Sequence, residues 1–158
     1  KNKIVSPQGT SFAIPLVAGF SACAWQLKRE LNNMQLFENI QKSADLYPYF
    51  DYAHGYGVPQ ASYFISGQQD SLSQPKTFDF VNENDVLKVV VRQEFINQKV
   101  KGSKGYLYYH IQNADGTLME YNVIEINQGE VITLPVNDFD SGCKLNVHLG
   151  GYTDTFIF

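Results

Sequence analysis

The sequence predicts an α+β chain in which a helical part precedes an antiparallel β-sandwich. Up to residue 66 the apolar residues recur at helical spacing or fill whole helical segments, whereas from residue 76 they alternate with polar residues. Residues 67–75 are polar, contain Gly, Ser and Pro, and show no periodicity, which is typical of a linker. We therefore expect a helical part at 1–66, a linker at 67–75 and a β-domain at 76–158.

Composition restricts the classes of protein to which the chain can belong. Its 158 residues suffice for one ordinary domain or two small ones, and 44% of them are hydrophobic, enough for a buried core. The net charge of -4 and the lack of a Lys/Arg cluster argue against a nucleic-acid partner. Cys23 and Cys143 lie far apart, and we expect two free thiols rather than a disulfide. No secretory signal peptide is visible, although an N-terminally truncated chain would not show one.

The first predicted helix runs from residue 11 to about residue 30 and is apolar on nearly every side. A helix of this kind is expected to be buried on all sides. Pro15 is tolerated because it falls near the first turn, where backbone N–H groups have no partner within the helix. The apolar segment 12–27 is interrupted by Pro15, Gly19 and other small or polar residues, so we do not expect it to span a membrane.

A second helix is predicted from Met34 to Ala44, with Asn32 as its cap and Gln35 three residues later. A turn-rich aromatic stretch follows at 47–52. We then expect a short helix with Pro59 at its first position.

Seven short strands are predicted in the second part, because apolar residues alternate there with period two. Asp115-Gly116 is a strong hairpin signal between two of them. A change of phase along 117–126 predicts a bulge near Val123. Short strands at this spacing favour a sandwich, and we expect them at the following ranges: 77–81, 87–95, 107–112, 117–126, 131–136, 143–149 and 152–158.

Ser11 is the leading candidate for a catalytic residue. It follows a small, turn-forming Gly-Thr pair and opens a long apolar helix, as a nucleophile at a helix N-terminus does. Taken alone, Gly-Thr-Ser is more often a simple helix cap. The run 9–19 nevertheless resembles the nucleophile segment of the subtilisin-like serine peptidases, and the agreeing positions are in register: Gly9, Thr10, Ser11, Ala13, Pro15, Val17, Ala18 and Gly19.

A second match lies downstream and has the expected order. Ser43-Ala44-Asp45 followed by Tyr56-Gly57-Val58-Pro59 resembles the segment that closes the subtilisin-like catalytic domain. In that family a helix ends in a Thr/Ser-Ala pair and the chain returns through a Gly-Tyr-Gly turn. Together the two matches cover about residues 3–65.

The resemblance implies a secreted or cell-surface serine endopeptidase that acts on protein or peptide substrates without a cofactor or metal. Ser11 would be the nucleophile, and its backbone N–H would form half of the oxyanion hole. The Asp and His motifs of the family, which precede the serine, are absent from these residues. We therefore interpret 1–66 as the C-terminal part of a catalytic domain, and we expect the chain alone to be inactive, because a triad works as a unit.

The resemblance also leaves the 12–27 helix without the parallel sheet that would cover it. Three arrangements are open: association with a missing N-terminal piece, a homodimer formed through this helix, or packing of the helix on the β-domain. We favour the last two for this chain.

The other candidate sites have simpler explanations. We expect His54 to be a surface turn residue, and His110 and His148 to be solvated on polar strand faces. Asn137–Asp140 could hold calcium, although a polar turn is the better interpretation. Tyr106 and Tyr108 could form a platform for sugar or peptide, but cross-strand packing is favoured.

The β-domain looks like the immunoglobulin- or fibronectin-like domains appended to many subtilisin-like peptidases. The alternative to an active parent is a pseudo-peptidase whose sandwich is a binding module for glycan or protein.

Overall fold

The computed structural model describes residues 9–66, 75–98, 105–126 and 131–158. The chain has an α+β fold, as expected from the sequence, and it divides into two compact units. The helical unit holds the described residues up to Ala44 and the segment 58–66. The β unit holds Asp45–Gly57 and the described residues from Pro75 onward. Of the predicted linker 67–75, only Pro75 lies within the described residues.

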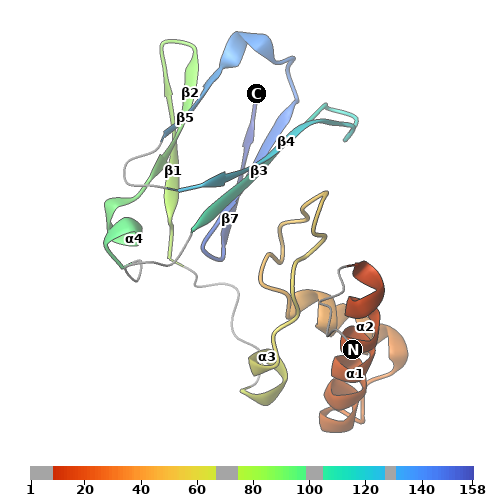
Figure 1. Ribbon diagram of the computed structural model, residues 1–158. Helices are drawn as coiled ribbons and strands as arrows, with labels where there is room; N and C mark the ends of the chain where they lie inside the picture. The colour runs from red at the N-terminus through yellow and green to blue at the C-terminus, as the bar shows by residue number, and fades with distance from the viewer. Residues whose placement is uncertain (1–8, 67–74, 99–104, 127–130) are drawn as a thin grey trace, which may run out of the picture. The chain divides into compact units, whose positions relative to one another are not determined.

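The described residues of the helical unit form η1 (Thr10–Phe12), α1 (Ala13–Leu27), α2 (Asn33–Lys42) and α3 (Ser62–Ile65), and Figure 1 labels the three α-helices. Ala24, Leu36 and Phe64, one from each of the three α-helices, form a small buried cluster. The rings of Phe20 and Phe64 meet edge to face with their centroids 5.7 Å apart. This cluster holds the three α-helices of the unit together.

The start of α2 confirms the predicted cap. Asn32 Oδ1 accepts a hydrogen bond from Gln35 N at 2.9 Å, and Gln35 Oε1 accepts one from Asn32 N at 2.9 Å. This reciprocal capping box satisfies two backbone donors that the first helical turn leaves unpaired. The short helix α3 begins at Ser62 and not at Pro59, because Pro59 lies in an extended bridge with Ala44.

Helix α1 is mostly exposed, so the expectation that it is buried on all sides is wrong for this structure. Ala24 is its one buried residue, while Ile14 and Leu16 are 68% and 74% exposed. The reason is that α2 and α3 contact α1 and leave most of its apolar surface uncovered. Thr10–Leu27 also has the length and composition of a membrane-crossing helix, a criterion that core helices and signal sequences meet equally.

The β unit forms a β-sandwich of seven strands among the described residues. A three-stranded sheet has the order β1-β2-β5 and a four-stranded sheet the order β4-β3-β6-β7, with every pair antiparallel. The strands are β1 (Phe78–Glu83), β2 (Val86–Val91), β3 (Tyr106–Gln112), β4 (Leu118–Glu125), β5 (Val131–Pro135), β6 (Lys144–Leu149) and β7 (Tyr152–Ile157). Two short helices complete the unit: α4 (Gln93–Gln98) and η3 (Val136–Asp138).

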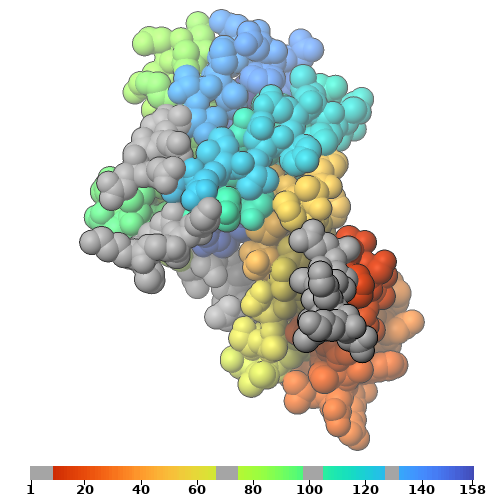
Figure 2. All heavy atoms as spheres, in the orientation of Figure 1, coloured from red at the N-terminus to blue at the C-terminus, as the bar shows by residue number. Residues whose placement is uncertain are grey.

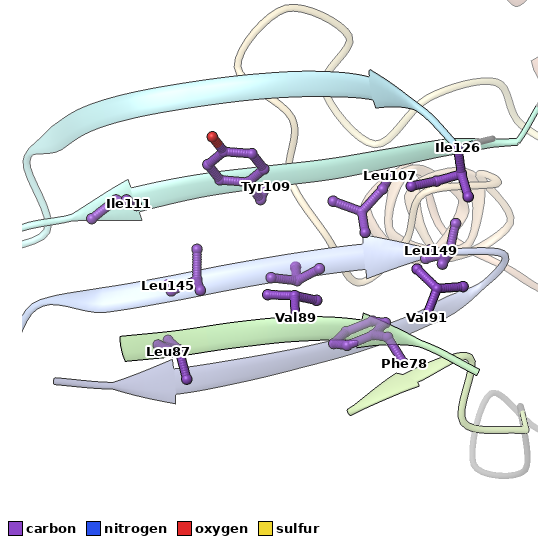
Figure 3. Packing of buried hydrophobic residues seen from close by; sticks show 11 residues of the cluster. Phe78, Leu87, Val89, Val91, Leu107, Tyr109, Ile111, Ile126, Leu145 and Leu149 are labelled. Carbon is purple, nitrogen blue, oxygen red and sulfur yellow. The ribbon is translucent and has the colours of Figure 1, made fainter. Parts of the chain in front are cut away.

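The core lies between the inner faces of the two sheets (Figure 3). Alternate residues of β2, β3 and β6 point into it, as the period of two predicts. The fully buried members include Leu87, Leu107, Ile111, Leu145 and Val147.

Two local predictions for the strands are wrong. Phe95 lies in α4 and not at the end of a strand, because β2 ends at Val91. The bulge is not near Val123: the register of β3 and β4 shifts between Ile111 and Gln112, opposite Met119. From Glu120 onward the side chains of β4 point alternately to the two faces of the sheet without interruption. The outward-facing side chains include exposed apolar residues, Tyr121 and Val123, and these made the apolar pattern of the sequence look as if it changed phase. The cyan surface in Figure 2 belongs to this strand and the turn before it.

We predict that Leu145→Ala lowers the free energy of unfolding by roughly 2–5 kcal/mol, because it leaves a cavity at the centre of the core. Urea unfolding of the full chain, followed by circular dichroism, measures this change. The matched control is Met119→Ala on exposed β4, which should change the free energy by less than about 0.5 kcal/mol. Equal effects of the two substitutions would contradict the core assignment.

Candidate functional site

Ser11 lies in the turn η1, which leads directly into α1. Gly9 precedes it with φ 151° and ψ 150°, a backbone conformation that is essentially limited to glycine. Phe12 N donates to Gly9 O at 3.1 Å and closes the turn. Ser11 is exposed, and its own N–H belongs to the first turn, where helix geometry supplies no acceptor.

The start of the helix can stabilise an oxyanion at Ser11, but the helical unit supplies no base for the serine hydroxyl. A helix N-terminus favours negative charge, so the Ser11 N–H is placed to donate to an oxyanion. A serine hydroxyl also needs a base that takes its proton. All three histidines of the sequence, His54, His110 and His148, belong to the β unit, so the helical unit offers Ser11 no imidazole.

The second segment that resembles the subtilisin-like family closes on itself in the structure. Helix α2 ends before Ser43, and Ala44 pairs with Pro59 in an antiparallel bridge. Gln60 N donates to Ser43 O at 3.0 Å and continues this pairing. The Ser-Ala pair and the returning chain are thus joined, although Ala44 and Pro59 are fifteen positions apart in the sequence.

Gly57 is the residue that lets the returning chain pass closely. Its φ is 85°, and a Cβ at this position would overlap the carboxylate of Asp45. Leu46 N also donates to Tyr56 O at 3.1 Å. Both the backbone conformation and the close approach therefore require glycine here.

The segment Asp45–Gly57 packs on the outer face of the four-stranded sheet. Tyr49 is only 2% exposed and lies against His110 of β3 and His148 of β6, with ring centroids 5.0 and 5.6 Å away. Tyr49 Oη and His110 Nδ1 are hydrogen-bonded at 2.9 Å, and His148 Nδ1 bonds Thr153 Oγ1 at 2.7 Å. We call Tyr49, His110 and His148 the tyrosine–histidine cluster.

Both strand histidines are therefore buried, and the prediction that they are solvated is wrong. The alternation along β3 and β6 correctly placed them on the face opposite the core. That face is covered by a segment far away in the sequence. The signal available in the sequence was the aromatic run 47–52, which has more apolar area than an exposed turn needs.

Burial controls the protonation of the cluster. It lowers the pKa of His148 to about 4, which the negative charge of Asp45 only partly offsets. Burial likewise lowers the pKa of His110, against the opposing charge of Asp51. Burial, with a smaller effect of Asp51, raises the pKa of Tyr49 well above its usual range. At neutral pH all three side chains are uncharged.

His54 is, as expected, a turn residue with an exposed side chain, 58% of it accessible. Its Nδ1 lies 2.6 Å from Oδ2 of Asp51, which is itself buried. The same Oδ2 accepts hydrogen bonds from Ala53 N and His54 N. Asp51 Oδ1 is buried and has no hydrogen-bond partner among the described residues.

The described residues contain no cluster of three His, Cys, Asp or Glu side chains that could hold a metal ion. Asn137 and Asp138 belong to η3, which is followed by an extended residue, so this segment forms a polar turn. Cys23 is exposed and Cys143 is buried, and both are free thiols.

Comparison of the chain with models of known families, with curated proteins and with solved structures finds no match in any of the three. The function must therefore be argued from the residues and their geometry.

We predict that acid destabilises the β unit through His148. Its pKa is about 4 when folded against 6.5 when free, so the unfolded chain binds the extra proton between these values. Stability due to this residue is complete above pH 6.5 and falls as the pH drops toward 4. The loss reaches about 3 kcal/mol.

Urea unfolding between pH 7.5 and 4.5 measures this loss. His148→Gln should flatten the slope, whereas Met119→Ala, which alters an exposed side chain without a titratable group, should keep it. An unchanged slope in a folded His148→Gln protein would show that other groups cause the acid sensitivity.

Proposed function

We propose that this chain carries the nucleophile segment of a subtilisin-like serine endopeptidase, with Ser11 as the attacking residue. The observation that carries the proposal is the start of α1. A glycine in a conformation essentially limited to glycine is followed, two residues later, by an exposed serine in the first turn of an apolar helix. A capping serine would not by itself require that glycine.

The surface of α1 supports the proposal. Phe12, Ile14, Leu16 and Val17 are all exposed, although fully burying one such side chain is worth roughly 1.5–3 kcal/mol. In the subtilisin-like fold, the helix after the serine is covered by a parallel sheet and other helices. Without those elements, the apolar side chains of such a helix would be exposed to solvent, as they are on α1.

The closing segment gives separate support. In the family, the chain returns to a Ser/Thr-Ala pair at the end of a helix after a Gly-Tyr-Gly turn. Here the Ala44–Pro59 bridge makes that return, and Gly55 and Gly57 both adopt positive φ, 62° and 85°. These residues resemble the family in their sequence order.

In the proposed reaction, Ser11 Oγ attacks the scissile carbonyl carbon while a histidine takes the hydroxyl proton. The Ser11 N–H donates to the oxyanion of the tetrahedral intermediate. The same proton then passes to the leaving amine, and water hydrolyses the acyl-enzyme. The base and its aspartate must reach Ser11 from outside the helical unit, because that unit has no histidine.

The β-sandwich would then be an accessory domain of a secreted or cell-surface enzyme that cleaves proteins or peptides. The open side of α1 would pack on further catalytic-domain residues or on a second copy of the chain. The alternative, a pseudo-peptidase whose sandwich serves as a binding module, is favoured by one observation, the aromatic hollow described below.

We predict that a fluorophosphonate probe labels Ser11 in the protein expressed from its complete natural reading frame, because the probe reacts with an activated serine. Mass spectrometry of the labelled peptide identifies the site, and Ser11→Ala should abolish labelling. The matched control is Ser21→Ala on the same helix, where Ser21 Oγ only donates to Val17 O at 2.7 Å. It should leave labelling unchanged.

We also predict that residues 1–158 alone do not hydrolyse a peptide substrate and are not labelled, because Ser11 lacks its base. A folded natural protein that stays unlabelled at Ser11 would contradict the peptidase proposal and favour the pseudo-peptidase. Hydrolysis by residues 1–158 that Ser11→Ala abolishes would instead place a base within this chain.

A further inference from the structure

The β unit has an open hollow of about 360 Å³ beside the tyrosine–histidine cluster. The segment that carries Tyr49 forms one wall, β3 and β6 form the floor, and α4 with the turn between β6 and β7 forms the rest. Its volume lies within the range of small-molecule sites. It is lined by Asp45, Leu46, Phe95, Gly105, Tyr106, Tyr108, His148, Leu149, Gly150 and Gly151.

Three of the lining residues are phenylalanine or tyrosine: Phe95, Tyr106 and Tyr108. Tyr106 and Tyr108 stand on the same face of β3, two residues apart, and Tyr106 is 39% exposed. Phe95 of α4 lies so close to Gly150 that a Cβ there would overlap its ring. Gly150 and Gly151 both have positive φ, 59° and 88°, as a two-residue hairpin turn requires.

The polar groups are few and varied. Asp45 contributes a carboxylate, the two tyrosines contribute hydroxyls, and the hairpin turn contributes backbone groups that lie outside the strand ladder. Burial keeps His148 neutral, so its ring adds a polar atom and not a charge. Among the charged side chains, the described lining has the carboxylate of Asp45 and neither Lys nor Arg.

We propose that this hollow binds a neutral pyranose sugar. Aromatic faces offer the apolar surface on which the C–H face of such a ring can stack. Hydroxyls, a carboxylate and the backbone groups of the turn offer the types of hydrogen bond that its equatorial hydroxyls need. The site stands on the β unit alone, so it does not depend on whether Ser11 is a nucleophile.

The experiment titrates the full chain with methyl glycosides of glucose, galactose, mannose and N-acetylglucosamine, followed by amide NMR. We expect at least one to bind with a dissociation constant on the order of 1 mM. The amide signals of Gly105, Gly150 and Gly151, which line the hollow, should shift.

Three variants locate the binding. Tyr106→Ala should weaken it about tenfold by removing a stacking face, whereas Tyr106→Phe should keep it within about twofold. Tyr121→Ala removes an exposed tyrosine of β4 outside the hollow and should leave the affinity unchanged. Unchanged amide spectra elsewhere in each variant show that the fold is retained.

The proposal is wrong if none of the four glycosides shifts the three glycine signals. It is equally wrong if Tyr106→Ala binds as tightly as the unaltered chain. Choline, added as a positively charged probe of similar size, should produce no such shifts. Selective binding of choline over the glycosides would assign the hollow to an organic cation instead.

Discussion

The burial of Tyr49 determines the environment of the outer face of the four-stranded sheet. The inner face of the four-stranded sheet is covered by the other sheet, as in any sandwich. Its outer face at β3 and β6 would be open to water without Tyr49, which is 2% exposed and bonded to His110. Because this side chain is in place, both strand histidines are neutral, and Asp45 and Leu46 stand beside Tyr108 as a wall of the hollow.

The sequence predicted those parts of the fold that local patterns determine. The seven strands follow from alternation, and the Asn32–Gln35 capping box follows from residues three apart. The contact of Tyr49 with His110 joins residues 61 positions apart, which no periodicity encodes. For the same reason the burial of His148 was missed. At the candidate sites, the helical turn that holds Ser11 ahead of α1 was foreseen, whereas the hollow was foreseen only through Tyr106 and Tyr108.

The exposed sides of α1 impose a physical requirement on any account of this protein. Trp25 and Leu27 add to the apolar surface near the end of the helix, and an apolar groove of about 170 Å³ runs between α1 and α3. Surface of this kind marks a site of interaction with a protein or a membrane. A peptidase domain that supplies further elements meets this requirement directly. A pseudo-peptidase would cover the apolar surface of α1 in the same way, because the loss of catalytic residues does not change how the helix packs.

The Asp51–His54 pair invites a catalytic interpretation, but its own turn explains it. Oδ2 of Asp51 accepts hydrogen bonds from Ala53 N and His54 N as well as bonding the imidazole, and Asp51 pairs with Gly55 across the turn. These hydrogen bonds stabilise the turn, and this structural role of Asp51 does not require that His54 act on a substrate. His54 also follows Ser11 in the sequence, whereas the histidine of the subtilisin-like family precedes the serine. The base proposed for Ser11 is therefore better sought outside this pair.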